Sequence, residues 1–147
     1  MKDKIVCFAG HRYEWQNLNI KEKLKQTIIS LIEKQYTTFY VNDLGYFDRL
    51  CSEIVVGLKK EYSNIKIYKI LTYYHHNKTK WQLPPCFDGS ILPEIDTCYP
   101  KLIIIKKNEW LVKNSDILVC HIVDKYKSGA YRIVKYAQRI NKPIIFI

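Results

Sequence analysis

The chain has 147 residues, a length that suits one domain, residues 1–147, with a hydrophobic core of its own. Hydrophobic residues make up 48% and charged residues 26%, which excludes a disordered or low-complexity chain. No apolar run approaches the roughly 20 residues that span a bilayer, and the apolar stretch near the start is too short for a secretory signal. We therefore expect a cytoplasmic protein with no membrane partner.

The net charge is +10, from 24 basic and 14 acidic residues. Such an excess favours anionic partners, which are nucleic acids, anionic lipids or phosphorylated small molecules. Bidentate contacts to bases come from arginine, and only four of the basic residues are arginines, at positions 12, 49, 132 and 139. The basic residues are also scattered along the chain. A nucleic-acid partner is therefore disfavoured and is kept as an alternative.

The five cysteines stand at positions 7, 51, 86, 98 and 120, and no two of them form a Cys-x-x-Cys pair. Structural zinc prefers closely spaced ligand pairs, so we predict no metal site and no cofactor. Cys7 and Cys120 lie inside apolar runs and are expected to be small core residues.

Apolar runs and helical spacing alternate along the chain, which predicts strands and helices in turn. Asn19 and Glu22 have the spacing of a capping box at the start of the first helix. Residues 72–100 interrupt the pattern with four of the five prolines and are expected to be a long irregular insertion. The expected strands are residues 4–9, 38–41, 65–71, 116–123 and 143–147, and the expected helices are residues 19–35, 49–62, 105–113 and 130–140.

This alternation predicts an α/β fold with three layers, in which helices cover both faces of a mainly parallel sheet of about five strands. Right-handed crossovers place the carboxyl ends of all parallel strands at one edge of the sheet. Ligands of such sheets bind at that edge, where the strand order reverses. The residues that follow each strand are therefore the candidates for a binding site.

Three segments after strands carry suitable groups. Gly10, His11 and Arg12 follow the first strand, where glycine permits a close backbone approach and arginine suits a phosphate. Glycines near two helix starts add backbone N–H groups that bind anions, although Asp48 could simply cap its helix. The candidates in these two segments are Asn42, Asp43, Gly45 and Asp48 after the second strand and Ser128, Gly129, Ala130 and Tyr131 after the fourth. Together the segments predict a pocket for a nucleotide-like ligand.

Five aromatic side chains in the expected loops either stack on a base or pack the loops onto the domain, and the residues alone leave both interpretations open. They are Tyr13, Trp15, Tyr73, Tyr74 and Trp81.

The string CFAGHR at residues 7–12 resembles the opening of the SLOG superfamily, in particular its small stand-alone bacterial members of unknown function. The similarity continues in order through FDGSILP at 87–93, KKNEWLVKNSD at 106–116 and SGAYRIVKYA at 128–137. The resemblance implies a Rossmann-like fold, a nucleotide or nucleotide-derived signalling ligand, a homodimer or higher homo-oligomer, and a bacterial or phage origin. It adds Lys107 and Asn108 to the candidate site, since they match an Arg-Asn pair of the superfamily.

Two departures from the superfamily pattern bear on function. Asp43 places a negative charge beside the expected phosphate cradle. The phosphoribohydrolase relatives need a Glu four residues after the pocket glycine, and from Gly129 that position is Ile133. Without this carboxylate the chain lacks the group that attacks or stabilises the sugar, so we assign no catalytic residue.

The sequence thus predicts a protein that senses or sequesters a nucleotide-derived molecule, in a setting of phage–bacteria conflict that the resemblance alone implies. A nucleotide-processing hydrolase or transferase is the first alternative, and a nucleic-acid-binding protein is the second.

Overall fold

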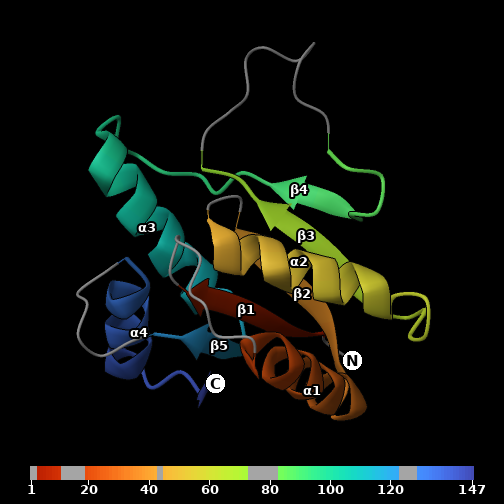
Figure 1. Ribbon diagram of the computed structural model, residues 1–147. Helices are drawn as coiled ribbons and strands as arrows, with labels where there is room; N and C mark the ends of the chain where they lie inside the picture. Colours follow the sequence, from red (N-terminus) through yellow and green to blue (C-terminus); the bar gives the residue numbers. More distant parts are fainter. Residues whose placement is uncertain (1–2, 11–18, 43–44, 73–82, 123–128) are drawn as a thin grey trace.

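A computed structural model of the chain describes residues 3–10, 19–42, 45–72, 83–122 and 129–147. These residues form six strands and four helices (Figure 1). The strands are β1 (Lys4–Gly10), β2 (Tyr36–Asn42), β3 (Lys66–Ile70), β4 (Gly89–Ile91), β5 (Ile117–His121) and β6 (Ile144–Phe146). The helices are α1 (Asn19–Glu33), α2 (Tyr46–Leu58), α3 (Pro100–Lys113) and α4 (Gly129–Arg139).

The strands form one sheet in the order β4-β3-β2-β1-β5-β6, and every neighbouring pair is parallel. Strands β2, β3 and β4 follow one another on one side of β1, and β5 and β6 lie on its other side. The strand order therefore reverses between β1 and β5, where Gly10 is the register partner of His121. The expected α/β fold with a parallel sheet is confirmed.

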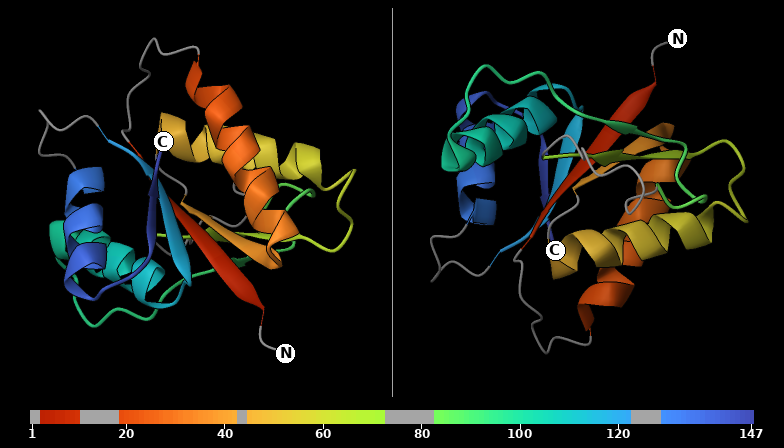
Figure 2. Two further views of the ribbon diagram at one scale, coloured as in Figure 1. Left: turned by 90° about the horizontal axis from the view of Figure 1, so that it is seen from below. Right: turned by 90° about the horizontal axis from the view of Figure 1, so that it is seen from above.

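Helices α1 and α2 cover one face of the sheet, and α3 and α4 cover the other (Figure 2). Side chains of a strand point alternately to its two faces. On β1, Val6 and Phe8 pack with α1 and α2, whereas Cys7 and Ala9 pack with α3 and α4. Each face thus buries its own hydrophobic cluster. No helix in the described part of the chain is long and apolar enough to cross a membrane.

The structure differs from the sequence-based elements mainly between residues 72 and 105. Strand β4 lies inside the expected irregular segment. Strand β4 has only three residues, too few for an alternation of apolar and polar side chains to be recognised. It forms a strand because it pairs with the edge of β3. Helix α3 begins at Pro100, five residues earlier than expected, since proline is well accommodated in the first turn of a helix.

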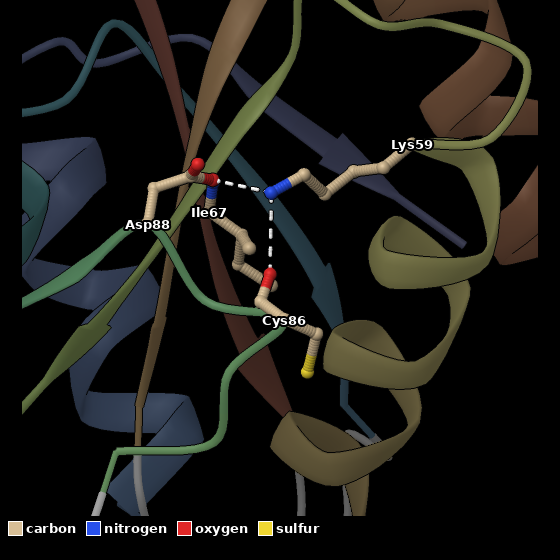
Figure 3. Close-up of polar contacts among 4 residues, drawn as sticks. All are labelled: Lys59, Ile67, Cys86 and Asp88. Atoms are coloured by element: carbon tan, nitrogen blue, oxygen red, sulfur yellow. Dashed lines mark hydrogen bonds and ion pairs between the residues drawn. The ribbon is translucent and has the colours of Figure 1, made fainter.

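A polar clamp fastens β4 to the rest of the sheet (Figure 3). Asp88 Oδ2 accepts a hydrogen bond from the Ile67 backbone N–H at 2.9 Å and pairs with Lys59 Nζ at 2.7 Å. Lys59 Nζ also donates to the Cys86 carbonyl oxygen at 3.2 Å. Lys59 directly follows α2, so one side chain ties this helix to the segment that precedes β4.

The Asp88 pKa is lowered by these contacts. Partial burial by itself would raise it, but the hydrogen bonds from Lys59 and Ile67 and the positive charges of Lys59 and Lys66 together outweigh the burial. A carboxylate whose pKa is lowered on folding stabilises the folded state above its unfolded-state pKa, and this contribution is lost as the pH falls through the lowered value.

Asp88→Asn should therefore lower the free energy of unfolding by about 1–2 kcal/mol at neutral pH, because it removes a charged hydrogen-bond acceptor. Urea unfolding of both proteins across pH would measure this. The difference should shrink as the pH falls below 3.8, the ordinary pKa of aspartate. The control Asp96→Asn breaks the exposed pair with Lys106 and should leave stability nearly unchanged. An Asp88→Asn protein as stable as the wild type at pH 7 would contradict a stabilising clamp.

Candidate functional site

The structure describes nine of the thirteen candidate site residues. The other candidates, His11, Arg12, Asp43 and Ser128, lie outside the described residues, as do the aromatic candidates Tyr13, Trp15, Tyr73, Tyr74 and Trp81. The described candidates are Gly10, Asn42, Gly45, Asp48, Lys107, Asn108, Gly129, Ala130 and Tyr131. They all belong to the carboxyl edge of the sheet or to α3.

At the point where the strand order reverses, the α2 side of the edge is filled by a side chain of the protein itself. The Phe47 ring lies directly against Gly10, where a Cβ atom would overlap it. The same ring stacks on His121, with ring centroids 6.4 Å apart and planes at 25°. His121 Nδ1 in turn lies 3.0 Å from the Ile147 carbonyl oxygen. Phe47 and His121 therefore close this side of the edge.

The structure gives Gly10 a packing role that the sequence did not predict. The Phe47 ring occupies the space that a side chain at position 10 would need, and the close approach of a ligand to Gly10 stays a prediction. Sequence reasoning missed both Phe47 and His121. Phe47 stands in the polar segment that leads into a helix, and His121 lies within an apolar run that predicts a strand.

The start of α2 provides little for an external anion. Gly45 is its N-cap residue and has φ of 94°, a conformation that favours glycine. Asp48 does not occupy the N-cap position that the alternative interpretation gave it. It lies in the first turn and is 8% exposed. A buried carboxylate there interacts favourably with the helix dipole and disfavours a second negative charge.

On the other face of the sheet, a group of polar side chains is buried beneath α3. Lys107 is fully buried, and its Nζ donates a hydrogen bond to Thr72 Oγ1 at 2.8 Å. Thr72 stands two residues beyond Ile70, the register partner of Asn42. Asn42 lies on the same sheet face, because Tyr40, two residues before it, packs with the α3 and α4 cluster. The carboxyl ends of β2 and β3 thus gather three polar residues, which we call the edge cluster: Asn42, Thr72 and Lys107.

Asn42 is the anomalous member of the edge cluster. It is 7% exposed, and no donor among the described residues reaches its buried Oδ1 atom. Buried polar atoms in folded proteins nearly always have a partner, and leaving one without costs about 1–3 kcal/mol. This atom is therefore a buried acceptor that no described donor satisfies.

A second group of candidates lines a groove of about 680 Å³ between α3 and α4. Asn108 contributes from α3, and Gly129 and Tyr131 contribute from the start of α4. A Cβ added to Gly129 would have nothing within 4 Å. Ala130 instead points into the core. Ile133, at the position of the expected Glu, is buried at the bottom of this groove.

The single site expected from the sequence is therefore divided by α3. Lys107 and Asn108 are adjacent, but successive residues of a helix point about 100° apart. Lys107 contacts Thr72 within the edge cluster, and Asn108 lines the groove. Thr72 joins the edge cluster without having been a candidate. Its only sequence signal is that it follows the third strand.

Neither group has the ligands of a metal centre. No three His, Cys, Asp or Glu side chains of the described ranges come close enough to hold a metal ion. Two adjacent histidines of the sequence, His75 and His76, lie outside these ranges.

Searches with the sequence found no matching family model and no matching curated protein. Similar folds occur among solved structures. One is TM1055, with a TM-score of 0.61 at 15% identity, covering 96% of this chain and 72% of that one. Two structures of the molybdenum cofactor carrier protein of Chlamydomonas reinhardtii have TM-scores of 0.56 and 0.53 at 14% and 13% identity. They cover 100% and 98% of this chain and 77% and 76% of theirs.

These similarities show a Rossmann-like α/β fold. At this level of identity they show the fold alone, and membership of the superfamily stays a prediction.

Gly10→Ala should destabilise the protein by about 1–3 kcal/mol, because the added methyl group displaces the Phe47 ring. Gly57→Ala is the matched control. Gly57 lies within α2 with open space around its Cα, so alanine should raise stability by about 0.5–1 kcal/mol through helix propensity. Urea denaturation of the two variants measures both effects. Equal stability of Gly10→Ala and the wild type would show that the packing of the Phe47 ring does not require a glycine at position 10.

Thiol labelling should distinguish two groups of cysteines. Burial raises the pKa of Cys7 and of Cys120 to about 12 and raises that of Cys51 well above its ordinary value. Thiolates are the reactive form. A chromogenic disulfide reagent at pH 8 should therefore label only the exposed Cys86 and Cys98 in the folded protein, and all five cysteines after denaturation. Rapid labelling of a third thiol would contradict the buried placement.

Proposed function

We propose that the protein binds a nucleotide-derived small molecule at the carboxyl edge of the sheet, on the side covered by α3 and α4, and senses or sequesters it. The observation that carries this proposal is the buried Asn42 Oδ1 atom, which no described donor satisfies. An unsatisfied acceptor at the edge where ligands of parallel sheets bind is best explained by a ligand that donates to it.

The edge cluster has the chemistry to bind such a molecule. Asn42 Oδ1 accepts a hydrogen bond, as a sugar hydroxyl or a base N–H would supply. Lys107 brings an ammonium group to the same corner, where its Nζ lies 2.8 Å from Thr72 Oγ1. Ammonium groups bind phosphates and carboxylates as point charges. A nucleotide carries both hydroxyl donors and anionic acceptors, so it matches both residues.

The proposed ligand approaches the carboxyl edge from one side of the sheet. Phe47 and His121 close the α2 side of the edge next to Gly10, and Asp48 disfavours an anion at the start of α2. The small side chain of Ala9 and the edge cluster lie on the opposite side. We therefore place the ligand at the edge cluster, on the side of the sheet that α3 and α4 cover.

The proteins of similar fold support the binding of a small molecule more than they support its enzymatic conversion. Two of them are named as carriers of the molybdenum cofactor, which suggests that this fold suits holding a small molecule. Ile133, rather than a carboxylate, stands at the position of the expected catalytic Glu and is buried. Nucleotide processing is thus the weaker candidate. Self-association, which the superfamily resemblance implies, stays a prediction.

A thermal-shift screen of the purified protein against mono-, di- and cyclic nucleotides, followed by product analysis of each mixture, tests the proposal. A ligand at 100 times its Kd should stabilise the fold by about 2.7 kcal/mol. A shift with the nucleotide recovered intact supports a sensor or sequestering protein. A shift with conversion would make the protein an enzyme, and no shift with any nucleotide would refute nucleotide binding.

Asn42→Leu should separate stability from binding. Leucine has a similar shape and no unsatisfied acceptor, so the ligand-free variant should be more stable than the wild type by about 1 kcal/mol or more. The same change should abolish the thermal shift given by the nucleotide that stabilises the wild type. A variant that is less stable than the wild type and retains the full shift would place Asn42 in the packing of the fold and outside the binding site.

A further inference from the structure

We propose that the groove between α3 and α4 is a second binding site, separate from the edge cluster, and that it takes a small organic anion with a flat apolar body. Its volume of about 680 Å³ lies within the range of roughly 300–1,000 Å³ that is usual for small-molecule sites. The groove runs along α4 from Gly129 to Arg139, a length of about 15 Å at the rise of an α-helix.

The bottom of the groove is apolar. Ile133 lies there almost completely buried, and Ile104 and Ile105 line the α3 side with half-buried side chains. Two tyrosines of α4, Tyr131 and Tyr136, add flat ring surfaces. Apolar and aromatic walls of this kind stabilise the body of a ligand by removing its surface from water.

The rim of the groove is basic. Its exposed basic residues are Lys101 from α3 and Arg132, Lys135 and Arg139 from α4, and Glu109 is the acidic residue that lines the groove with them. The rim therefore has a positive potential close to the apolar bottom. A ligand that carries negative charge at one end and an apolar ring at the other meets both surfaces at once.

Cation–π contacts hold two of the basic groups beside the aromatic walls. Lys135 Nζ lies 5.4 Å from the centroid of the Tyr131 ring, and the Arg139 guanidinium carbon lies 5.0 Å from that of Tyr136. Such contacts occur within about 6 Å of a ring centroid and restrict the cation. A ligand ring stacked on either tyrosine would place its anionic group next to a cation that is already positioned.

The charge of the groove disfavours a second copy of this chain as its occupant. A two-fold interface brings the same patch of each protomer together, so the basic rims would face each other with only Glu109 to offset them. The groove is also separate from the edge cluster, because neither Asn42, Thr72 nor Lys107 lines it. This inference therefore stands without the proposed nucleotide site.

The test is calorimetric titration of the full chain with 1-anilinonaphthalene-8-sulfonate, an aromatic anion of suitable size. We expect saturable binding of one molecule per chain. The double variant Lys135→Glu/Arg139→Glu changes only exposed side chains and should weaken binding by about tenfold or more, since it replaces two cations of the rim with anions. Gly129→Leu should also weaken it, because the new side chain extends into the groove without meeting any atom at its Cβ.

The matched control is Lys21→Glu/Lys25→Glu, which makes the same change in net charge on exposed positions of α1, on the opposite face of the sheet. It should alter the affinity less than twofold. Equal weakening by both double variants would reduce the effect to overall charge and overturn the proposal. Undiminished binding by Lys135→Glu/Arg139→Glu would overturn it as well.

Two further measurements separate this site from the other possibilities. Asn42→Leu should bind the sulfonate as the wild type does, whereas a weaker affinity would mean that the groove and the edge cluster form one site. Sedimentation should give the same oligomeric state for wild type and Lys135→Glu/Arg139→Glu. A dimer that only the wild type forms would assign the groove to a second copy of the chain and overturn the proposal.

Discussion

Strand β1 is paired along both edges and covered on both faces, and the remaining elements are arranged around it. Parallel neighbours need crossover connections, and these place helices against the sheet. Because the side chains of β1 alternate between two apolar clusters, helices must cover both faces. The chain fills one edge of β1 with β2 and the other with β5. The reversal of strand order next to Gly10 follows from this central position.

At the point where the strand order reverses, a packing contact fills the carboxyl edge of the sheet on one of its two sides. Phe47 lies across Gly10 and stacks on His121, so the α2 side is filled by the protein itself. A glycine at the end of a strand is usually explained by a ligand or a turn, but here it makes room for an aromatic ring. Asn42 and Lys107 are buried on the opposite side of the sheet, which is where we propose that the ligand binds.

Helix α3 separates two groups of residues with different chemical character. On its inner side Lys107 reaches the end of β3 and helps to form a small polar cluster within the core. On its outer side Asn108 belongs to a wide groove with an apolar bottom and a basic rim. The first suits a molecule that donates and accepts individual hydrogen bonds. The second suits an anion with an apolar body, so the two sites would recognise different parts of a ligand or different ligands.

Periodicity and turn residues were sufficient to predict the order of most strands and helices, the parallel sheet and the edge at which polar residues gather. These features follow from local patterns of apolar residues and from the handedness of crossovers. Strand β4 was beyond such reasoning, because three residues carry no detectable period and form a strand only where β3 offers an edge. The division of the candidate site was also beyond it. Whether Lys107 and Asn108 share a pocket depends on which side of α3 meets the sheet, and long-range packing of Leu111 and Val112 decides that.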